Sequence, residues 1–251
     1  MHSIYLLGGD GSNPDGRIET YGRFFEAAST PQGCRIALLI AEEGDARAET
    51  FEAYAEIFRS VGATQPMLTG ISVAPTTPLT KARLLALNPT AIFVCGGLTP
   101  RYQEALCIDR SWLEFLSERN IVYGGVSAGA AIAAKRAVVG GWRVQRGERI
   151  RQILYQGASE GCDLLDTRQG LGLVPYTVDV HASQWGTLTR LMHAVALGVV
   201  GPSWGIDEDT LLEVRSDRYL VSGSGHVYIV RLTSDGTLNV TILTSGDEIL
   251  F

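Results

Sequence analysis

The sequence contains few cysteines, and none of them is spaced for metal or redox chemistry. Its four cysteines lack Cys-x-x-Cys spacing and no His/Cys cluster accompanies them, so we expect reduced thiols and neither a metal nor another cofactor. No apolar run approaches the roughly 20 residues that cross a membrane. Residues 1–7 lead directly into an expected strand, without the charged region and cleavage site of a signal peptide. These absences predict a cytoplasmic protein that contacts no membrane.

Basic residues are also in deficit. The 21 Lys and Arg residues against 27 Asp and Glu residues give a net charge of −6, and no basic cluster stands out. This balance argues against a nucleic-acid partner. The 251 residues, 45% of them hydrophobic, suffice for a large core, and no repeat, low-complexity tract or linker divides them. We therefore expect a single domain over 1–251.

Strand and helix patterns alternate over the first 200 residues. The clearest helix covers 45–61, where Phe51, Tyr54 and Phe58 share one face and Gly62 provides a stop. Repeated β-α units predict an α/β protein with a doubly wound, mostly parallel sheet and with active groups at the carboxyl ends of its strands. The other expected helices cover 21–28, 80–87, 111–119, 128–134 and 183–197, and the expected strands cover 3–7, 35–40, 91–95, 120–123 and 177–180.

The pattern becomes all-β after about residue 201. A strand is expected over 206–214, and further strand-like runs broken by Gly and Asp-Gly lie between residues 219 and 243. We expect these to be antiparallel strands that close the same domain.

A Gly-x-Ser-x-Gly pattern occurs three times, at Ser127, Ser159 and Ser203. Only Ser127 lies between an expected strand and an expected helix of small residues. That context predicts a sharp turn that lifts the serine hydroxyl above the sheet edge, while the following N–H faces a developing oxyanion. The alternative is a glycine-rich turn that merely allows close packing.

Two further glycine clusters follow expected strands. The cluster Gly8-Gly-Asp-Gly11 lacks the Gly-Lys-Ser/Thr and the spacing of a phosphate-binding loop, so we interpret it as a plain turn. Gly96-Gly97 ends a buried strand near the strand that leads to Ser127. A backbone N–H there is a candidate for the second oxyanion donor.

A serine nucleophile needs a base and an acid that orients it. Of the four histidines, His181 lies at the carboxyl end of an expected strand, which makes it the best-placed base. The orienting acid is either Asp179 or one member of Asp207-Glu208-Asp209. The residues alone do not decide between them.

Five motifs together resemble the serine peptidase family of dipeptidase E and cyanophycinase, in the same order and over nearly the whole chain. They are Val94-Cys-Gly96-Gly97, Gly125-Val-Ser127-Ala-Gly-Ala130, His181 with Thr189-Arg-Leu191, Gly205-Ile-Asp-Glu208-Asp-Thr210 and Val221-Ser-Gly-Ser-Gly225-His-Val227. The resemblance implies a flavodoxin-like fold, similar to the glutaminase domain of class I amidotransferases, and it implies a homodimer.

Carried over position by position, the resemblance implies Ser127 as nucleophile, His181 as base and Glu208 as orienting acid. It also implies oxyanion-hole amides at Gly97 and Ala128. Substrate contacts are expected from Leu98, Thr99, Asp179, Trp185 and Arg190. The implied activity is hydrolysis of short or aspartyl-linked peptides through an acyl-enzyme.

The chain departs from the family pattern near His181 and after Gly96-Gly97, the two motifs from which substrate contacts are expected. Val180 replaces a glutamine of cyanophycinases, Leu98 replaces an Asp or Asn, and an arginine expected soon after His181 is absent. Trp142 stands near the place of the aspartate used by the dipeptidase E branch. These changes motivate an alternative, a catalytically silent ligand-binding or regulatory protein. A glutamine amidotransferase would need cysteine at Ser127.

Overall fold

Eight strands form the large sheet of the protein, whose computed structural model describes residues 3–11, 13–216 and 218–250. The strand order is β16-β13-β12-β1-β5-β4-β2-β3. The five strands from β1 to β3 in this order are mutually parallel. Their bounds are β1 Ile4–Leu7, β2 Ile36–Ile40, β3 Leu68–Ser72, β4 Ala91–Val94 and β5 Val122–Val126. Every residue of β1, β2 and β4 is buried, as expected for parallel strands covered on both faces.

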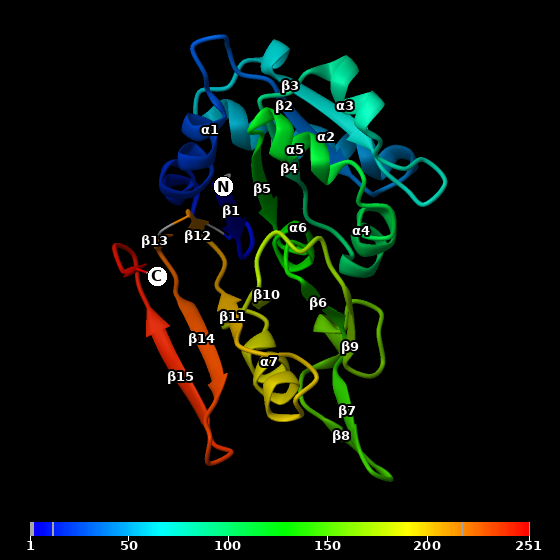
Figure 1. Ribbon diagram of the computed structural model, residues 1–251, viewed down its shortest axis with the longest axis vertical. Helices are drawn as coiled ribbons and strands as arrows, with labels where there is room; N and C mark the ends of the chain where they lie inside the picture. The colour runs from blue at the N-terminus through cyan, green and yellow to red at the C-terminus, as the bar shows by residue number, and fades with distance from the viewer. Residues whose placement is uncertain (1–2, 12, 217, 251) are drawn as a thin grey trace.

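Helices cover this parallel sheet in the upper half of Figure 1 and confirm the predicted α/β class. An aromatic cluster joins them to the strands, because Phe93 of β4 lies 5.1 Å from Phe24 of α1 and 5.0 Å from Phe58 of α2, centroid to centroid. Such edge-to-face contacts add to the free energy of burying the rings. The helices are α1 Arg23–Ala28, α2 Gly44–Ser60, α3 Lys81–Leu87, α4 Thr99–Leu106, α5 Leu113–Arg119 and α6 Ala128–Ile132.

The late strands do not all close the same sheet, and the single strand expected over 206–214 is wrong. The chain leaves a second sheet at β11 Ser203–Ile206, turns at Asp207–Asp209, and enters the large sheet at β12 Thr210–Val214. Asp209 adopts a left-handed φ of 51°, which interrupts the extended backbone. β12, β13 Arg218–Gly223 and β16 Glu248–Leu250 extend the large sheet with antiparallel pairing, as predicted for this region.

A second, four-stranded sheet lies in the lower half of Figure 1, beside α7 Thr187–Ala196. Its order is β10-β11-β14-β15, in which β10 Thr177–Val180 and β11 are parallel and β14 Val227–Leu232 and β15 Leu238–Leu243 are antiparallel. The helix expected over 183–197 begins four residues later than predicted, after a turn at 182–185.

Two small antiparallel pairs, absent from the predictions, occupy the segment between α6 and β10. They pair β6 Arg136–Gly140 with β9 Asp166–Gln169, and β7 Arg143–Arg146 with β8 Arg149–Gln152. The β7–β8 hairpin lies at the lower end of the molecule in Figure 1. Its two strands consist mostly of polar residues, so their hydropathy pattern does not reveal a buried face.

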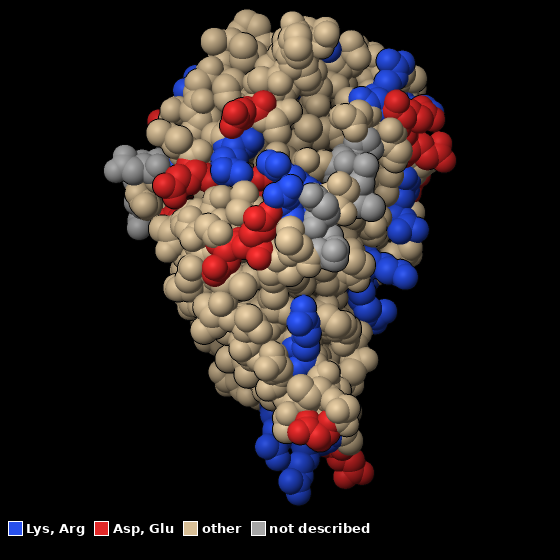
Figure 2. Space-filling model, turned by 60° about the vertical axis from the view of Figure 1, so that its left-hand side comes forward, with Lys and Arg blue, Asp and Glu red and all other residues tan. Residues whose placement is uncertain are grey.

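The distribution of charge on the surface and the hydropathy of the helices match what the composition of the sequence predicts. Figure 2 shows a face on which acidic and basic side chains are interspersed among uncharged ones. Within the described part of the chain, no helix is both long enough and apolar enough to cross a membrane. All four cysteine thiols are free, and three of them are buried.

Candidate active site

Ser127 lies at a tight bend between β5 and α6. Its φ of 52° and ψ of −112° place it outside the common backbone regions, which is the strained geometry of a nucleophile elbow. A Cβ on Gly125 would lie 2.5 Å from the carbonyl oxygen of Gly129, and one on Gly129 would lie 2.3 Å from that of Val94. Both flanking glycines are therefore required for α6 to pack directly against the strands.

His181 follows β10 and reaches the elbow from the second sheet. Its Nε2 lies 2.8 Å from Ser127 Oγ. The backbone of His181 is also left-handed, with a φ of 53°, and its N–H donates to the carbonyl oxygen of Gly8 at 3.1 Å. The indole of Trp185 stacks on the imidazole with ring centroids 3.9 Å apart and planes 8° apart. These contacts hold the ring with Nε2 toward the serine.

Glu208 lies on the other side of the imidazole. Its Oε1 is 2.7 Å from His181 Nδ1, and its backbone N–H donates to the side-chain oxygen of Gln184 at 3.0 Å. A carboxylate at Nδ1 favours the tautomer that carries its proton there, so Nε2 is left free to accept the proton of the Ser127 hydroxyl. The structure thus brings Ser127, His181 and Glu208 into one hydrogen-bonded chain.

Burial sets the protonation of His181. Removal from water lowers the pKa of the imidazole below its ordinary value, while the hydrogen bond to Glu208 and its negative charge oppose that shift. A lowered pKa keeps the ring neutral, and therefore able to accept a proton, over a wider pH range than for an exposed histidine.

Asp207 anchors the turn that carries Glu208. Its carboxylate is 1% exposed and accepts hydrogen bonds from Ser183 N and Oγ at 2.9 and 2.7 Å and from His226 N at 3.0 Å. Ser183 follows the His181 segment and His226 precedes β14, so one buried carboxylate ties three segments together. This connection fixes the position of Glu208 relative to His181.

The loop that follows β1 contacts the site directly, which the interpretation of Gly8–Gly11 as a plain turn missed. A Cβ on Gly9 would lie 2.4 Å from His181 Cε1 and 2.9 Å from Glu208 Cγ. The carbonyl oxygen of Gly9 also accepts from Asp209 N at 3.1 Å. The position of the loop after a strand was the signal that could have revealed this contact. β1 pairs with β5 in parallel, so both strands end at the same edge of the sheet, where the elbow lies.

The segment after β4 lies beside the elbow. A Cβ on Gly96 would lie 3.4 Å from Ser127 Cβ. In the described part of the chain, neither the Gly97 amide nor the Ala128 amide donates a hydrogen bond to a protein group. These two amides, one in the segment beside the elbow and one directly after Ser127, therefore have no described protein acceptor.

Leu98 and Thr99, the next two residues, begin helix α4. The Leu98 side chain is 44% exposed, whereas Thr99 is buried and its amide donates to Glu160 Oε2 at 3.0 Å. Glu160 therefore caps α4 from the segment before β9, and burial raises the pKa of its carboxyl group. Of this pair, Leu98 presents its side chain to solvent and Thr99 does not.

Asp179 and Arg190, two expected substrate contacts, form a buried ion pair instead. Arg190 Nε donates to Asp179 Oδ2 at 2.9 Å and Nη2 donates to Oδ1 at 2.8 Å. The side chain of Arg190 is 4% exposed and that of Asp179 is 1% exposed, so neither is accessible to a substrate. The Asp179 carboxylate is bonded to Arg190 and not to His181, so the carboxylate beside the imidazole is that of Glu208. Trp185 covers the His181 ring.

Metal binding has no structural support in the residues described: they contain no group of three or more His, Cys, Asp or Glu that could hold an ion. Trp142, near the place of the dipeptidase E aspartate, donates its indole N–H to Asp163 Oδ1 at 3.1 Å.

Comparison with known proteins adds a sequence relationship to this geometry, although no protein-family model matches. The chain is 33% identical over 147 residues to a cyanophycinase of Geminocystis herdmanii, covering 56% of this chain and 49% of that protein. It is 29% identical over 183 residues to a cyanophycinase of Trichormus variabilis, covering 70% of this chain and 57% of that protein. The chain thus spans about half the length of these relatives.

Two solved structures share the fold. A peptidase from an acI-B1 actinobacterium gives a TM-score of 0.65 at 18% identity and covers 100% of this chain and 97% of its own. A protein from Listeria monocytogenes EGD-e gives 0.54 at 16% identity, with 90% of this chain and 100% of its own covered. At these identities the comparison concerns the arrangement of the chain alone.

Proposed function

We propose that the chain is a member of the peptidase E–cyanophycinase family, as its similarity to cyanophycinases supports, and that it is a serine peptidase that uses Ser127, His181 and Glu208. The observation that carries the proposal is the continuous hydrogen-bonded chain from Ser127 Oγ through both nitrogens of His181 to Glu208, with contacts of 2.8 and 2.7 Å. A structural serine has no need of a strained bend, an oriented imidazole and a carboxylate behind it.

The proposed reaction has two halves. Ser127 Oγ attacks the peptide carbonyl carbon while His181 Nε2 takes the hydroxyl proton, and Glu208 stabilises the imidazolium that forms. The amides of Gly97 and Ala128 donate to the tetrahedral oxyanion. As the C–N bond breaks, His181 returns the proton to the leaving amine, which leaves an ester on Ser127. Water, deprotonated by the same imidazole, then hydrolyses the ester and regenerates the hydroxyl.

The proposed substrates are short or aspartyl-linked peptides. The relatives are cyanophycinases, and this supports an aspartyl-linked peptide. The exposed Leu98 beside the oxyanion segment offers an apolar contact where relatives carry Asp or Asn. The proposed reaction uses no metal or cofactor. A homodimer and a cytoplasmic location stay predictions.

Covalent labelling tests the proposal. We expect a fluorophosphonate probe to modify the native protein on Ser127, as located by peptide mass spectrometry, and to leave Ser127→Ala unmodified. Ser159→Ala and Ser203→Ala are matched controls, because those serines share the Gly-x-Ser-x-Gly pattern and should not change the labelling. A native protein that takes no label and cleaves no member of a dipeptide panel would instead be the catalytically silent alternative.

The pH dependence of labelling follows from His181. Since the neutral imidazole is the base, the second-order labelling rate should rise with pH and level off once the ring is deprotonated. Burial lowers the pKa of His181, so the midpoint should fall below that of an ordinary histidine. Removing the negative charge in Glu208→Gln should move the midpoint lower still, because that charge favours the imidazolium. A midpoint above the ordinary value, or one unmoved in Glu208→Gln, would contradict this assignment.

Adding one methyl group at Gly9 should disable the site with little loss of stability. In Gly9→Ala the new Cβ would overlap His181 and Glu208, so these side chains must move apart. We expect kcat to fall by roughly 100-fold, the usual cost of about 1 Å of misplacement. Gly201→Ala is the control, since a Cβ there meets nothing within 4 Å. Full activity of Gly9→Ala at an unchanged melting temperature would show that the loop does not position the pair.

A further inference from the structure

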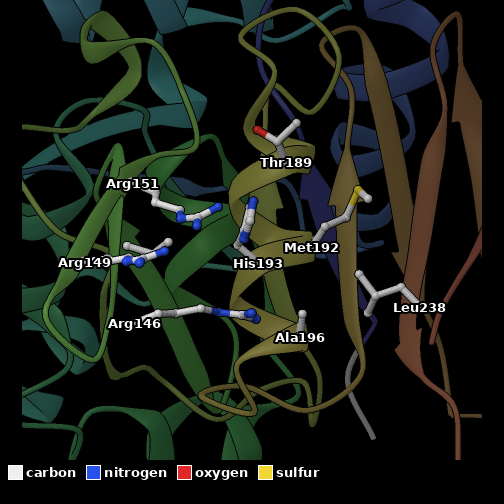
Figure 3. A pocket seen from close by; sticks show the side chains of 9 residues that line it. Arg146, Arg149, Arg151, Thr189, Met192, His193, Ala196 and Leu238 are labelled. Atoms are coloured by element: carbon white, nitrogen blue, oxygen red, sulfur yellow. The ribbon is translucent and has the colours of Figure 1, made fainter. Parts of the chain in front are cut away.

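A pocket of about 420 Å³ lies between the β7–β8 hairpin and helix α7, apart from the elbow. Figure 3 shows Arg146, Arg149 and Arg151 extending from the hairpin toward His193 of α7. The remaining lining includes apolar side chains from three elements: Val144, Met192, Ala196 and Leu238. These four side chains form the apolar part of the lining, which we call the apolar floor, and the guanidinium groups reach toward α7 from the hairpin.

The three arginines share one face of the hairpin because of its register. Arg146 pairs directly with Arg149, and Val144 pairs with Arg151. Side chains at paired positions, and at positions two apart in one strand, point to the same side of a sheet. The hairpin therefore presents three positive charges toward α7. The sequence-based expectation that basic residues are not clustered is wrong at this place.

These charges have no partner among the residues that the structure describes. None of the three guanidinium groups forms an ion pair or hydrogen bond with a described residue, and no acidic residue lines the pocket. Like charges directly opposite each other in a strand pair are destabilising. Burial and the nearby Arg146 both lower the pKa of His193. The imidazole carries no negative charge, so it does not offset the repulsion among the arginines. An anionic ligand would relieve the repulsion.

The shape and chemistry of the pocket select the kind of anion. Guanidinium groups bind carboxylates and phosphates in a forked geometry. The apolar floor favours a ligand that also carries hydrocarbon, which a chain of acidic amino acids has and an inorganic phosphate lacks. We propose that this pocket binds a carboxylate-rich segment of a peptide, outside the residues at the proposed elbow.

Helix α7 connects the pocket with the candidate active site. The helix begins two residues after Trp185, which stacks on His181, and Thr189 in its first turn lines the pocket. The pocket continues to Ala196 at the end of the helix, about 10 Å further along the axis at 1.5 Å per residue. An acidic segment of the peptide that is cut can thus lie along α7; this last step rests on the proposed function.

Binding of fluorescein-labelled hexa-L-aspartate to full-length Ser127→Ala, followed by anisotropy at low salt, tests the site without turnover. We expect Arg146→Gln/Arg149→Gln/Arg151→Gln to weaken binding about 30-fold, from roughly threefold for each partly exposed charge. The same three positions changed to Lys should retain most of the affinity, which separates lost charge from a misfolded hairpin. A control triple of exposed arginines elsewhere, Arg47→Gln/Arg119→Gln/Arg231→Gln, has the same net charge and should bind as the parent does.

The inference would be overturned by no binding of hexa-aspartate to the parent, by equal weakening in both Gln triples, or by equal binding of hexa-L-asparagine. Stronger competition by tripolyphosphate than by unlabelled hexa-aspartate would also overturn it, in favour of a phosphate ligand.

Turnover then decides where the segment comes from. If peptides with an acidic extension lose their advantage in the triple Gln variant while a short neutral peptide is cleaved as before, the segment belongs to the substrate. If the protein cleaves no peptide at all, the proposed function fails, and the binding measurements still decide whether the pocket takes acidic peptides.

Discussion

His181→Gln is expected to lower kcat for peptide hydrolysis by about 10⁴-fold or more, with KM changed much less. The imidazole both accepts the Ser127 proton at 2.8 Å and returns it to the leaving amine, and glutamine can do neither. Residues that act as one unit show strongly non-additive losses. Ser127→Ala, His181→Gln and the double variant should therefore converge on a similar residual rate.

Steady-state kinetics on a cleavable dipeptide, with far-UV circular dichroism to check folding, measure this convergence. Independent, multiplying losses in the double variant would mean that the two residues do not act together. Retention of more than about a hundredth of the native kcat in a folded His181→Gln would require another base. Glu208→Gln should lie between the native and the His181→Gln rates, because it keeps the imidazole but removes the carboxylate that stabilises its charged form.

Arg190→Met is expected to lower the free energy of unfolding by about 3–5 kcal/mol, the cost of leaving a buried charge without its partner. The Asp179 carboxylate would lose two hydrogen bonds of 2.9 and 2.8 Å in a place that is 1% exposed. Arg190 Nη1 also donates to the carbonyl oxygen of Ala158 at 2.9 Å, so the segment before β9 loses a contact as well. Asp179 is two residues before His181, and the damage should spread toward the site.

Urea unfolding of three variants separates a buried pair from a substrate contact. Replacing both partners, Asp179→Leu with Arg190→Met, should restore much of the stability, because no unpaired charge remains. The exposed pair Arg59–Glu52 provides the control: its side chains are 40% and 63% exposed, and Arg59→Met should cost no more than about 1 kcal/mol. If Arg190→Met kept full stability while KM rose, the residue would contact substrate after all.

Local sequence patterns determined four of the five parallel strands, all but β3, and the position of the elbow. An apolar run of β-branched and large aliphatic residues bounded by turn residues favours a buried strand, and helical spacing at Phe51, Tyr54 and Phe58 favours α2, because both patterns depend only on near neighbours. Ser127 was distinguished from Ser159 and Ser203 by the strand before it and the helix after it. Its strained bend follows from that junction.

Tertiary structure alone decided which residues from distant segments meet. The elbow and His181 are 54 residues apart and belong to different sheets, and Glu208 follows 27 residues later. From its residues alone the sequence left Asp179 and the three acids of Asp207-Glu208-Asp209 as alternatives, and only the resemblance pointed to Glu208. The structure engages Asp179 with Arg190, because a carboxylate on a buried strand must find a charged partner nearby.

The same limit explains the missed features of the chain. The Gly8–Gly11 loop has an ordinary local sequence, and its role comes from the side chains that lie opposite it. The arginines of the β7–β8 hairpin are visible in the sequence, but only the strand register shows that Arg146, Arg149 and Arg151 share one face. Strand pairing in the second sheet joins β10 with β11 across helix α7, and β11 with β14 across two strands of the large sheet; periodicity carries no information about such partners. Short-range sterics and hydrophobic spacing therefore determined the elements, whereas long-range packing decided the site.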